Sequence, residues 1–125
     1  MIELEDPMGD VVEFEPAEIV LVFYSELLSP PSAKGNLIYE GVIRSVATTP
    51  TAIVRKIGTE AKMIKLTLPV GGLGSAQGPA WFNVARIGRV SQGPSGAIIK
   101  MKGQRGSVQV EENQEHVKEL IKAAS

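Results

Sequence analysis

Residues 87–124 read IGRVSQGPSGAIIKMKGQRGSVQVEENQEHVKELIKAA, and they predict two paired strands followed by a terminal helix. The run AIIKMK at 97–102 is largely apolar, GQRG at 103–106 offers a turn, and SVQVE at 107–111 alternates strictly, which is typical of a β-hairpin. In such a hairpin the apolar side chains of both strands share one face. We expect that face to hold Ile99, Met101, Val108 and Val110.

Residues 113–124 predict an amphipathic helix. Asn113 is a favourable N-cap and Glu115 follows in the first turn, where the helix dipole favours an acid. An apolar stripe runs along the segment at helical spacing. It consists of Val117, Leu120, Ile121 and Ala124. The helix must therefore cover an apolar surface.

Length and composition bound the class of protein. A chain of 125 residues is long enough for one domain with its own core. It has no cysteine, so disulfides and thiolate metal sites are excluded, and 13 glycines and 8 prolines favour a turn-rich β fold. No apolar run is long enough to span a bilayer, and the acidic start MIELED is unlike a signal peptide. We expect a soluble, cytoplasmic protein.

The pattern along the chain predicts a mainly β protein with about seven strands and one C-terminal helix, without an internal repeat. We expect a single domain in which residues 1–14 are an extended lead-in or edge strand, residues 15–112 form a small barrel, and residues 113–124 form a helix that caps it. Besides the terminal hairpin, strands are expected at 19–24, with 27–28 as an extension, at 37–47 with a bulge or a close-approach site at Gly41, at 51–57, and at 63–68. The core face of the last is Ile64, Leu66 and Leu68.

This order resembles the pleckstrin-homology-like (PH-like) barrel, in particular its small bacterial and archaeal versions. EPAEIVL at 15–21 is similar to the opening of that family's first strand, and SVATTPTAIV at 45–54 to its third-strand turn. Residues 90–121 look like its closing hairpin and the helix that plugs the barrel mouth. The resemblance implies a small antiparallel barrel and a binding role. Lipid-binding members have a basic loop where this chain has only Lys34 in 29–36, so phosphoinositide binding is not implied. An OB-like or SH3-like barrel is the alternative.

Charge is unevenly distributed along the sequence. Residues 1–43 carry nine acids against Lys34, whereas residues 44–105 carry ten basic residues against Glu60. Such blocks usually mix on the surface of a small β fold, and we favour that interpretation. The alternative is a basic face that binds nucleic acid or an acidic lipid surface. Its candidate residues are Arg44, Arg55, Lys56, Lys62 and Lys65.

No motif supports catalysis. The glycine-rich residues 71–78 lack the Lys of a phosphate-binding loop, and their glycines miss the dinucleotide-binding spacing. His116 is the only histidine, so neither a catalytic triad nor a histidine metal site can be assembled. We therefore expect no enzymatic activity, no catalytic residues, no metal and no cofactor.

Apolar residues in an irregular segment suggest a protein interface. Val70 and Leu73 lie in the loop 69–79, and Trp81 follows it. Exposed apolar groups of this kind often mark contact sites, and exposed strand edges recruit pairing partners. We expect a non-enzymatic binding or assembly module that contacts another protein or itself. A homo-oligomer would use an edge strand, at 11–14 or 63–68, together with residues 69–81.

Overall fold

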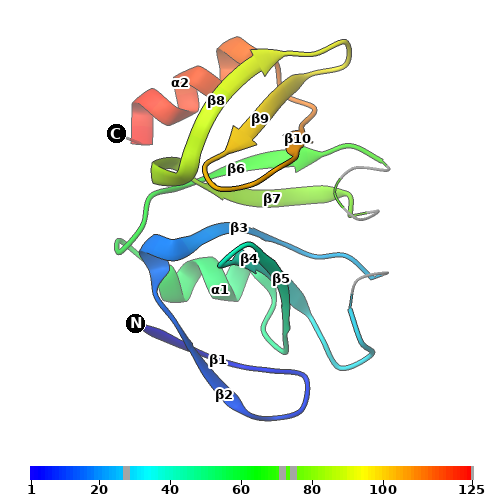
Figure 1. Ribbon diagram of the computed structural model, residues 1–125, viewed down its shortest axis with the longest axis vertical. Helices are drawn as coiled ribbons and strands as arrows, with labels where there is room; N and C mark the ends of the chain where they lie inside the picture. The colour runs from blue at the N-terminus through cyan, green and yellow to red at the C-terminus, as the bar shows by residue number, and fades with distance from the viewer. Residues whose placement is uncertain (27–28, 71–72, 74–75, 125) are drawn as a thin grey trace.

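The computed structural model describes residues 1–26, 29–70, 73 and 76–124. This part of the chain forms ten strands in three antiparallel sheets and two α-helices (Figure 1). The elements of the first half are β1 (Ile2–Glu5), β2 (Val11–Phe14), the 3-10 turn η1 (Pro16–Glu18), β3 (Ile19–Phe23), β4 (Gly35–Tyr39), β5 (Val42–Val46) and α1 (Pro50–Ile57). Those of the second half are β6 (Met63–Leu68), β7 (Gly78–Asn83), η3 (Val84–Arg86), β8 (Ile87–Gln92), β9 (Ala97–Met101), β10 (Ser107–Gln109) and α2 (Gln114–Ala124).

The sheets have the strand orders β1-β2, β5-β4-β3-β7-β6 and β10-β9-β8. Single backbone hydrogen bonds link neighbouring sheets: Ala47 N–H donates to Glu5 O at 2.8 Å, and Glu111 N–H donates to Thr67 O at 2.8 Å. The described strands therefore follow one another in space from β2 at one end to β8 at the other, and they do not close into a barrel. The mainly β class and the C-terminal helix are confirmed, whereas the expected count of seven strands was too low.

The chain contains two copies of one structural repeat, although no internal repeat was expected. Two strands, a 3-10 turn, three strands and a helix occur in that order twice. The registers also match, since Ile2 is opposite Phe14 in β1–β2 and Ile64 is opposite Phe82 in β6–β7. Both the β3–β4 and the β8–β9 pair carry a register shift near the first residue, at Ile19 and at Ile87. The two halves are therefore equivalent, residue by residue, over most of their strands.

Residues 51–57 form helix α1, so the strand expected there was wrong. The Thr49 side chain accepts a hydrogen bond from Ala52 N–H at 3.3 Å, and Pro50 occupies the first turn, where its missing N–H costs nothing. Ile53 and Ile57 are one helical turn apart and both are buried. The β-branched residues that suggested a strand lower helix propensity by only a fraction of a kcal/mol each, about 0.5. The N-terminal cap and the buried apolar stripe stabilise the helix by more than this loss of propensity.

Residues 37–47 form two strands, not one long strand with a bulge. Glu40 and Gly41 have φ values of 53° and 76°, which makes a two-residue hairpin turn between β4 and β5. Gly41 supplies the positive φ without a steric cost. The turn reverses the chain where a bulge would only have bent it.

The terminal hairpin and helix are confirmed. Val108 pairs with Ile99 across β9–β10, and Ile99, Met101 and Val110 are buried while Val108 is half-buried. His116 N–H donates to the Asn113 side chain at 2.8 Å, so Asn113 caps α2 as expected. Val117 is fully buried. Leu120, Ile121 and Ala124 are half-buried against the same cluster.

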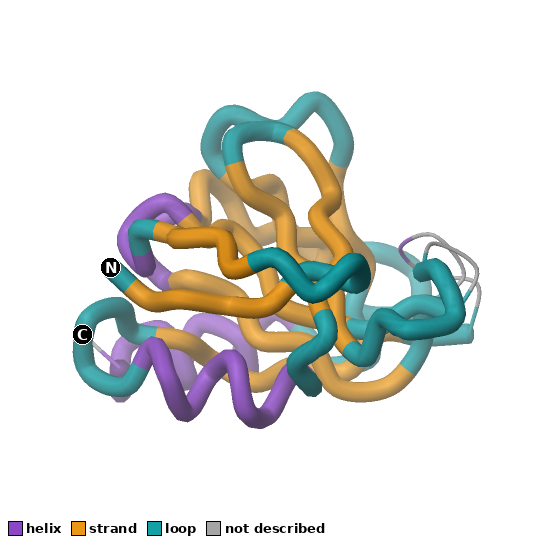
Figure 2. Tube along the Cα trace, turned by 90° about the horizontal axis from the view of Figure 1, so that it is seen from below, coloured by secondary structure: helices purple, strands orange, loops and turns teal. Residues whose placement is uncertain are grey.

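Two apolar clusters lie on opposite faces of the five-stranded sheet. The first-half cluster includes Phe14 and Ile53, and the second-half cluster includes Phe82 and Val117. Strand β3 is buried throughout and serves both, as was expected for the central strand. The predicted core face of β6 is also confirmed: Ile64, Leu66 and Leu68 are buried. Figure 2 shows the two α-helices along the lower side of the strands in that view.

Candidate protein-binding groove

The outer edge of β10 has no strand beside it among the described residues. It ends the order β10-β9-β8, and the residues that follow it are tied to β6 at Thr67. Glu111 N–H donates to Thr67 O at 2.8 Å, and the Glu112 carboxylate accepts from Thr67 N–H and from the Thr67 hydroxyl, each at 2.9 Å. A hollow of about 460 Å³ lies beside β10. The hollow is lined by Pro69, Val70, Leu73, Ser95, Ser107, Val108 and Gln109.

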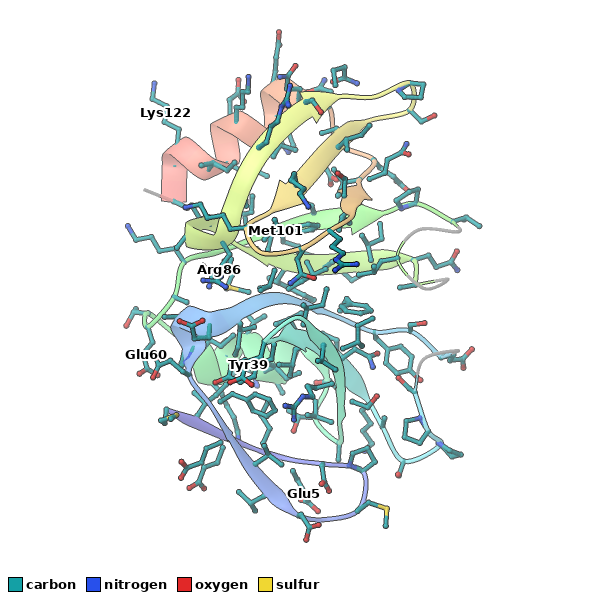
Figure 3. The ribbon with its side chains drawn as sticks, viewed as in Figure 1. Glu5, Tyr39, Glu60, Arg86, Met101 and Lys122 are labelled. Atoms are coloured by element: carbon teal, nitrogen blue, oxygen red, sulfur yellow. The ribbon has the colours of Figure 1, made fainter. Side chains whose placement is uncertain are left out.

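A second hollow of about 220 Å³ adjoins the first and shares Leu73, Ser107 and Val108 with it. It extends across Met101, labelled in Figure 3, to the β4–β5 hairpin of the first half. Its other lining residues are Ile38, Gly41, Ile43, Gln104 and Gly106. We call the two hollows together the β10 groove. It exists only because the fold brings a hairpin from each half together.

The β10 groove is uncharged, and it combines apolar side chains with neutral polar groups. No described residue that lines it carries a charge, and its polar groups are Ser, Gln and backbone. Val70 is 87 % exposed and Ile43 is 38 % exposed, so apolar surface is accessible at both ends. Val42, beside Ile43 in the same hairpin, is 53 % exposed. Exposed apolar groups gathered around a hollow are typical of a surface that binds another chain.

Two of the three predicted interface residues lie in this groove. Val70 and Leu73 line it together, whereas Trp81 does not. Trp81 belongs to β7, is half-buried against the first-half cluster, and has Lys65 Nζ 5.7 Å from its ring centroid. It lines a different hollow, of about 290 Å³, together with Tyr24.

Four apolar lining residues, Met101, Val108, Ile38 and Ile43, escaped prediction because they belong to regular strands. Met101 and Val108 were assigned to the hairpin's core face, and Ile38 and Ile43 were assigned to one uninterrupted strand. No local signal marks them as part of a groove. Only the arrangement of the two hairpins does.

The five candidate anion-binding residues come from four segments. Arg44 lies on β5, Arg55 and Lys56 on α1, Lys62 in the following connector, and Lys65 on β6. Lys56 Nζ donates to Glu3 O at 2.9 Å, and Lys65 lies over Trp81. Two of the five therefore already have partners within the chain, and anion binding stays a prediction.

The next observations, on metal binding and on membrane-spanning helices, apply to the described residues. Among residues 1–26, 29–70, 73 and 76–124, no group of three or more His, Cys, Asp or Glu could hold a metal ion. His116 is exposed on α2. The same part of the chain contains no helix long and apolar enough to cross a membrane. Residues 71–72 and 74–75 of the glycine-rich segment, and the extension expected at 27–28, lie outside the described residues.

No protein-family model matches the chain, and comparisons with curated proteins and with solved structures found no match.

Proposed function

We propose that the chain is a non-enzymatic protein-binding module whose β10 groove accepts an extended, apolar segment of a partner protein. The observation that carries this proposal is the unpaired outer edge of β10 beside an apolar floor of Met101, Val108 and Leu73. A strand edge offers main-chain donors and acceptors in one row. The floor beside it offers places for side chains.

Both parts of this surface suit β-strand addition. An added strand would gain main-chain hydrogen bonds from β10, and every second side chain would point to the same face. An apolar side chain that becomes fully buried in such a site contributes about 1.5–3 kcal/mol. Since the groove is uncharged, we expect the partner segment to alternate apolar residues with small or neutral polar ones. Charged residues on its inward face would be desolvated without a partner.

The alternative function, binding of nucleic acid or an acidic lipid surface, rests on the charge of residues 44–105 alone. It predicts an affinity that falls steeply as salt rises, because bound phosphates release counterions. Binding in the β10 groove predicts little change with salt. A PH-like relationship, suggested by the order of strands, stays a prediction. Of the three segments that suggested it, only residues 90–121 line the groove, for example with Met101 and Val108.

The proposal is tested by selecting decapeptides from an unbiased display library against the full chain. We expect the selected peptides to share apolar residues at alternate positions. Val70→Asp and Ile43→Asp should weaken their binding about tenfold or more, because each places a charge in the groove. Met8→Asp is the matched control, since Met8 is 86 % exposed in the β1–β2 turn and lines neither hollow. Selected peptides that bind Val70→Asp and Ile43→Asp as tightly as the parent protein would refute the proposal.

A further inference from the structure

The two ends of the strand order are unpaired. Strand β2 lies at the bottom of Figure 1 and β8 near its top, beside α2. Among the described strands, β2 pairs only with β1, and β8 pairs only with β9. Each molecule therefore has one free strand edge in its first half and a different one in its second half. These edges are separate from the β10 groove.

The internal repeat shows what these edges can bind. Strand β8 is the equivalent of β3, and β2 is the equivalent of β7. Within the chain β3 and β7 pair antiparallel and join the two halves, with Leu21 opposite Phe82 and Val22 opposite Trp81. In this junction the first half contributes β3 and the second half contributes β7. Because the two strands differ, the same kind of contact can also form between one molecule and the next.

We propose that β8 of one molecule pairs antiparallel with β2 of a second copy, so that the β3–β7 junction is repeated between molecules. The equivalent register places Arg89 opposite Phe14, and Val90 opposite Glu13 of the other molecule. The β2 edge is one of the two that the sequence predicted as contact sites. A heterologous contact of this kind yields a ring if the rotation closes, or an open chain if it does not.

Charge complementarity supports this pairing over the pairing of like edges. Residues 1–61 contain ten acidic and four basic residues, whereas residues 62–125 contain nine basic and four acidic ones. The same polarity holds at the edges, since Glu13 on β2 and Arg89 on β8 are both exposed. Two β2 edges or two β8 edges would repel each other, while a β2 edge attracts a β8 edge.

An ion pair at the internal junction also supports the pairing of β8 with β2 of a second copy. Arg86 Nη1 lies 3.8 Å from a Glu18 carboxylate oxygen. The two residues occupy equivalent places, at the last positions of η3 and η1. Arg86, labelled in Figure 3, lies between the two halves. The repeated junction therefore brings Arg86 of one molecule toward Glu18 of the next.

Several features make the contact between molecules weaker than the internal one. The buried Leu21, Phe23 and Ile38 correspond to residues that are polar in the second half. These are Arg89, Ser91 and Lys100. The Gln114 side chain also donates to Val90 O at 3.3 Å, and a new strand would compete with this bond wherever the carbonyl faces outward. We therefore expect a reversible association that weakens with salt.

Sedimentation equilibrium tests the proposal directly. The average mass of the wild-type chain should rise above 13.3 kDa with concentration. It should return to that value as salt rises from about 50 to about 500 mM, because the attraction between surface charges is screened. Arg89→Glu and Glu13→Lys should each weaken association about tenfold or more. An equal mixture of the two variants should recover association, because the β8 edge of Arg89→Glu is then acidic and the β2 edge of Glu13→Lys is basic, so the two edges attract each other again.

Arg105→Glu and Glu26→Lys are the matched controls, because both change an exposed charge away from the two edges. A wild-type chain that stays at 13.3 kDa up to its solubility limit overturns the proposal. So does association that survives both edge variants. Val70→Asp should leave self-association unchanged. If it abolishes association instead, the contact belongs to the β10 groove and the inference is wrong.

A disulfide experiment checks the register. The chain contains no cysteine, so single cysteines can be placed freely. A mixture of Val90→Cys and Glu13→Cys molecules should form a mixed disulfide rapidly on mild oxidation, since directly opposed residues lie within the allowed Cα separation of about 4.4–6.8 Å. A mixture with Val11→Cys in place of Glu13→Cys is offset by two residues and should react more slowly. Equal rates for both mixtures would contradict the register.

Discussion

Asn83 holds the two halves together, and its removal should destabilise the whole chain. The residue is 1 % exposed at the end of β7. Its Nδ2 donates to Ile19 O at 2.8 Å and lies 3.4 and 3.5 Å from Ala17 O and Pro16 O in the first half. Its Oδ1 accepts from Ala85 N–H at 3.1 Å and caps η3. One side chain therefore satisfies the backbone of both halves.

The cost of Asn83→Ala follows from these contacts. Of the three contacts of Nδ2, only the one to Ile19 O, at 2.8 Å, has the length of a strong hydrogen bond. Its loss leaves the buried Ile19 carbonyl without that donor, which costs about 1–3 kcal/mol. Loss of the cap adds about 0.5–2 kcal/mol. We expect a free energy of unfolding lower by about 2–4 kcal/mol, a large share of the roughly 5–15 kcal/mol typical of a domain.

Urea unfolding, followed by circular dichroism with a shared m value, measures this change. Asn83→Asp keeps the acceptor for Ala85 but turns the donor into a second acceptor, so it should cost at least as much as Asn83→Ala. Gln77→Ala removes an exposed amide from the same half and should stay within about 0.5 kcal/mol of the parent protein. If Asn83→Asp unfolds at the same urea concentration as the parent protein, the bond between the halves contributes nothing and our reasoning is refuted.

Other predictions concern equivalent positions of the repeat, and urea or thermal unfolding measures all of them. Val117→Ala in α2 and Ile53→Ala in α1 each truncate a fully buried side chain. We expect the free energy of unfolding to fall by about 1–3 kcal/mol for Val117→Ala and by about 2–5 kcal/mol for Ile53→Ala. A change below about 0.5 kcal/mol would show that the helix is not packed as described. Glu40→Asn should stabilise the β4–β5 turn by about 0.5 kcal/mol, because Asn tolerates a positive φ better, and a destabilised variant would contradict the turn. Gly103→Ala should cost about 1–2 kcal/mol at φ 79°, and an unchanged midpoint would contradict that conformation.

Local patterns predicted the second half of the chain better than the first. The β9–β10 hairpin and α2 carry strong signals over short distances, since turn residues, strict alternation and the Asn113 cap agree. Helix α1 carries a conflicting signal, because its β-branched residues favour a strand while Thr49 and Pro50 favour a helix start. Without tertiary contacts neither signal outweighs the other.

The internal repeat was visible in the sequence but was obscured by loops of unequal length. MIEL at 1–4 and MIKL at 63–66 begin the two halves, and each half has a Phe five residues before an Ile, at Phe14 and Phe82. Five residues separate β1 from β2, whereas nine separate β6 from β7. A search at one fixed period therefore fails. Equivalent positions can also differ in polarity where the second half is exposed to solvent, as Leu21 in the first half and Arg89 in the second half do.

The site was predicted only in part, for a similar reason. Val70 and Leu73 could be found because apolar residues are unusual in a loop that contains glycine and proline. Ile43 could not be found, because it becomes part of the groove only when the β4–β5 hairpin approaches β9 and β10. Contacts between hairpins that are distant in the sequence leave no local pattern.

Binding of a partner segment along β10 can be observed by NMR titration with the tightest-binding peptide from the display selection. We predict that the largest amide shifts occur at Ser107–Gln109, with intermolecular Hα–Hα contacts between the peptide and β10 and slower hydrogen exchange at its outward amides. Binding along β10 is ruled out if the amide signals of β10 do not shift and the shifts occur elsewhere, for example at Tyr24 and Trp81.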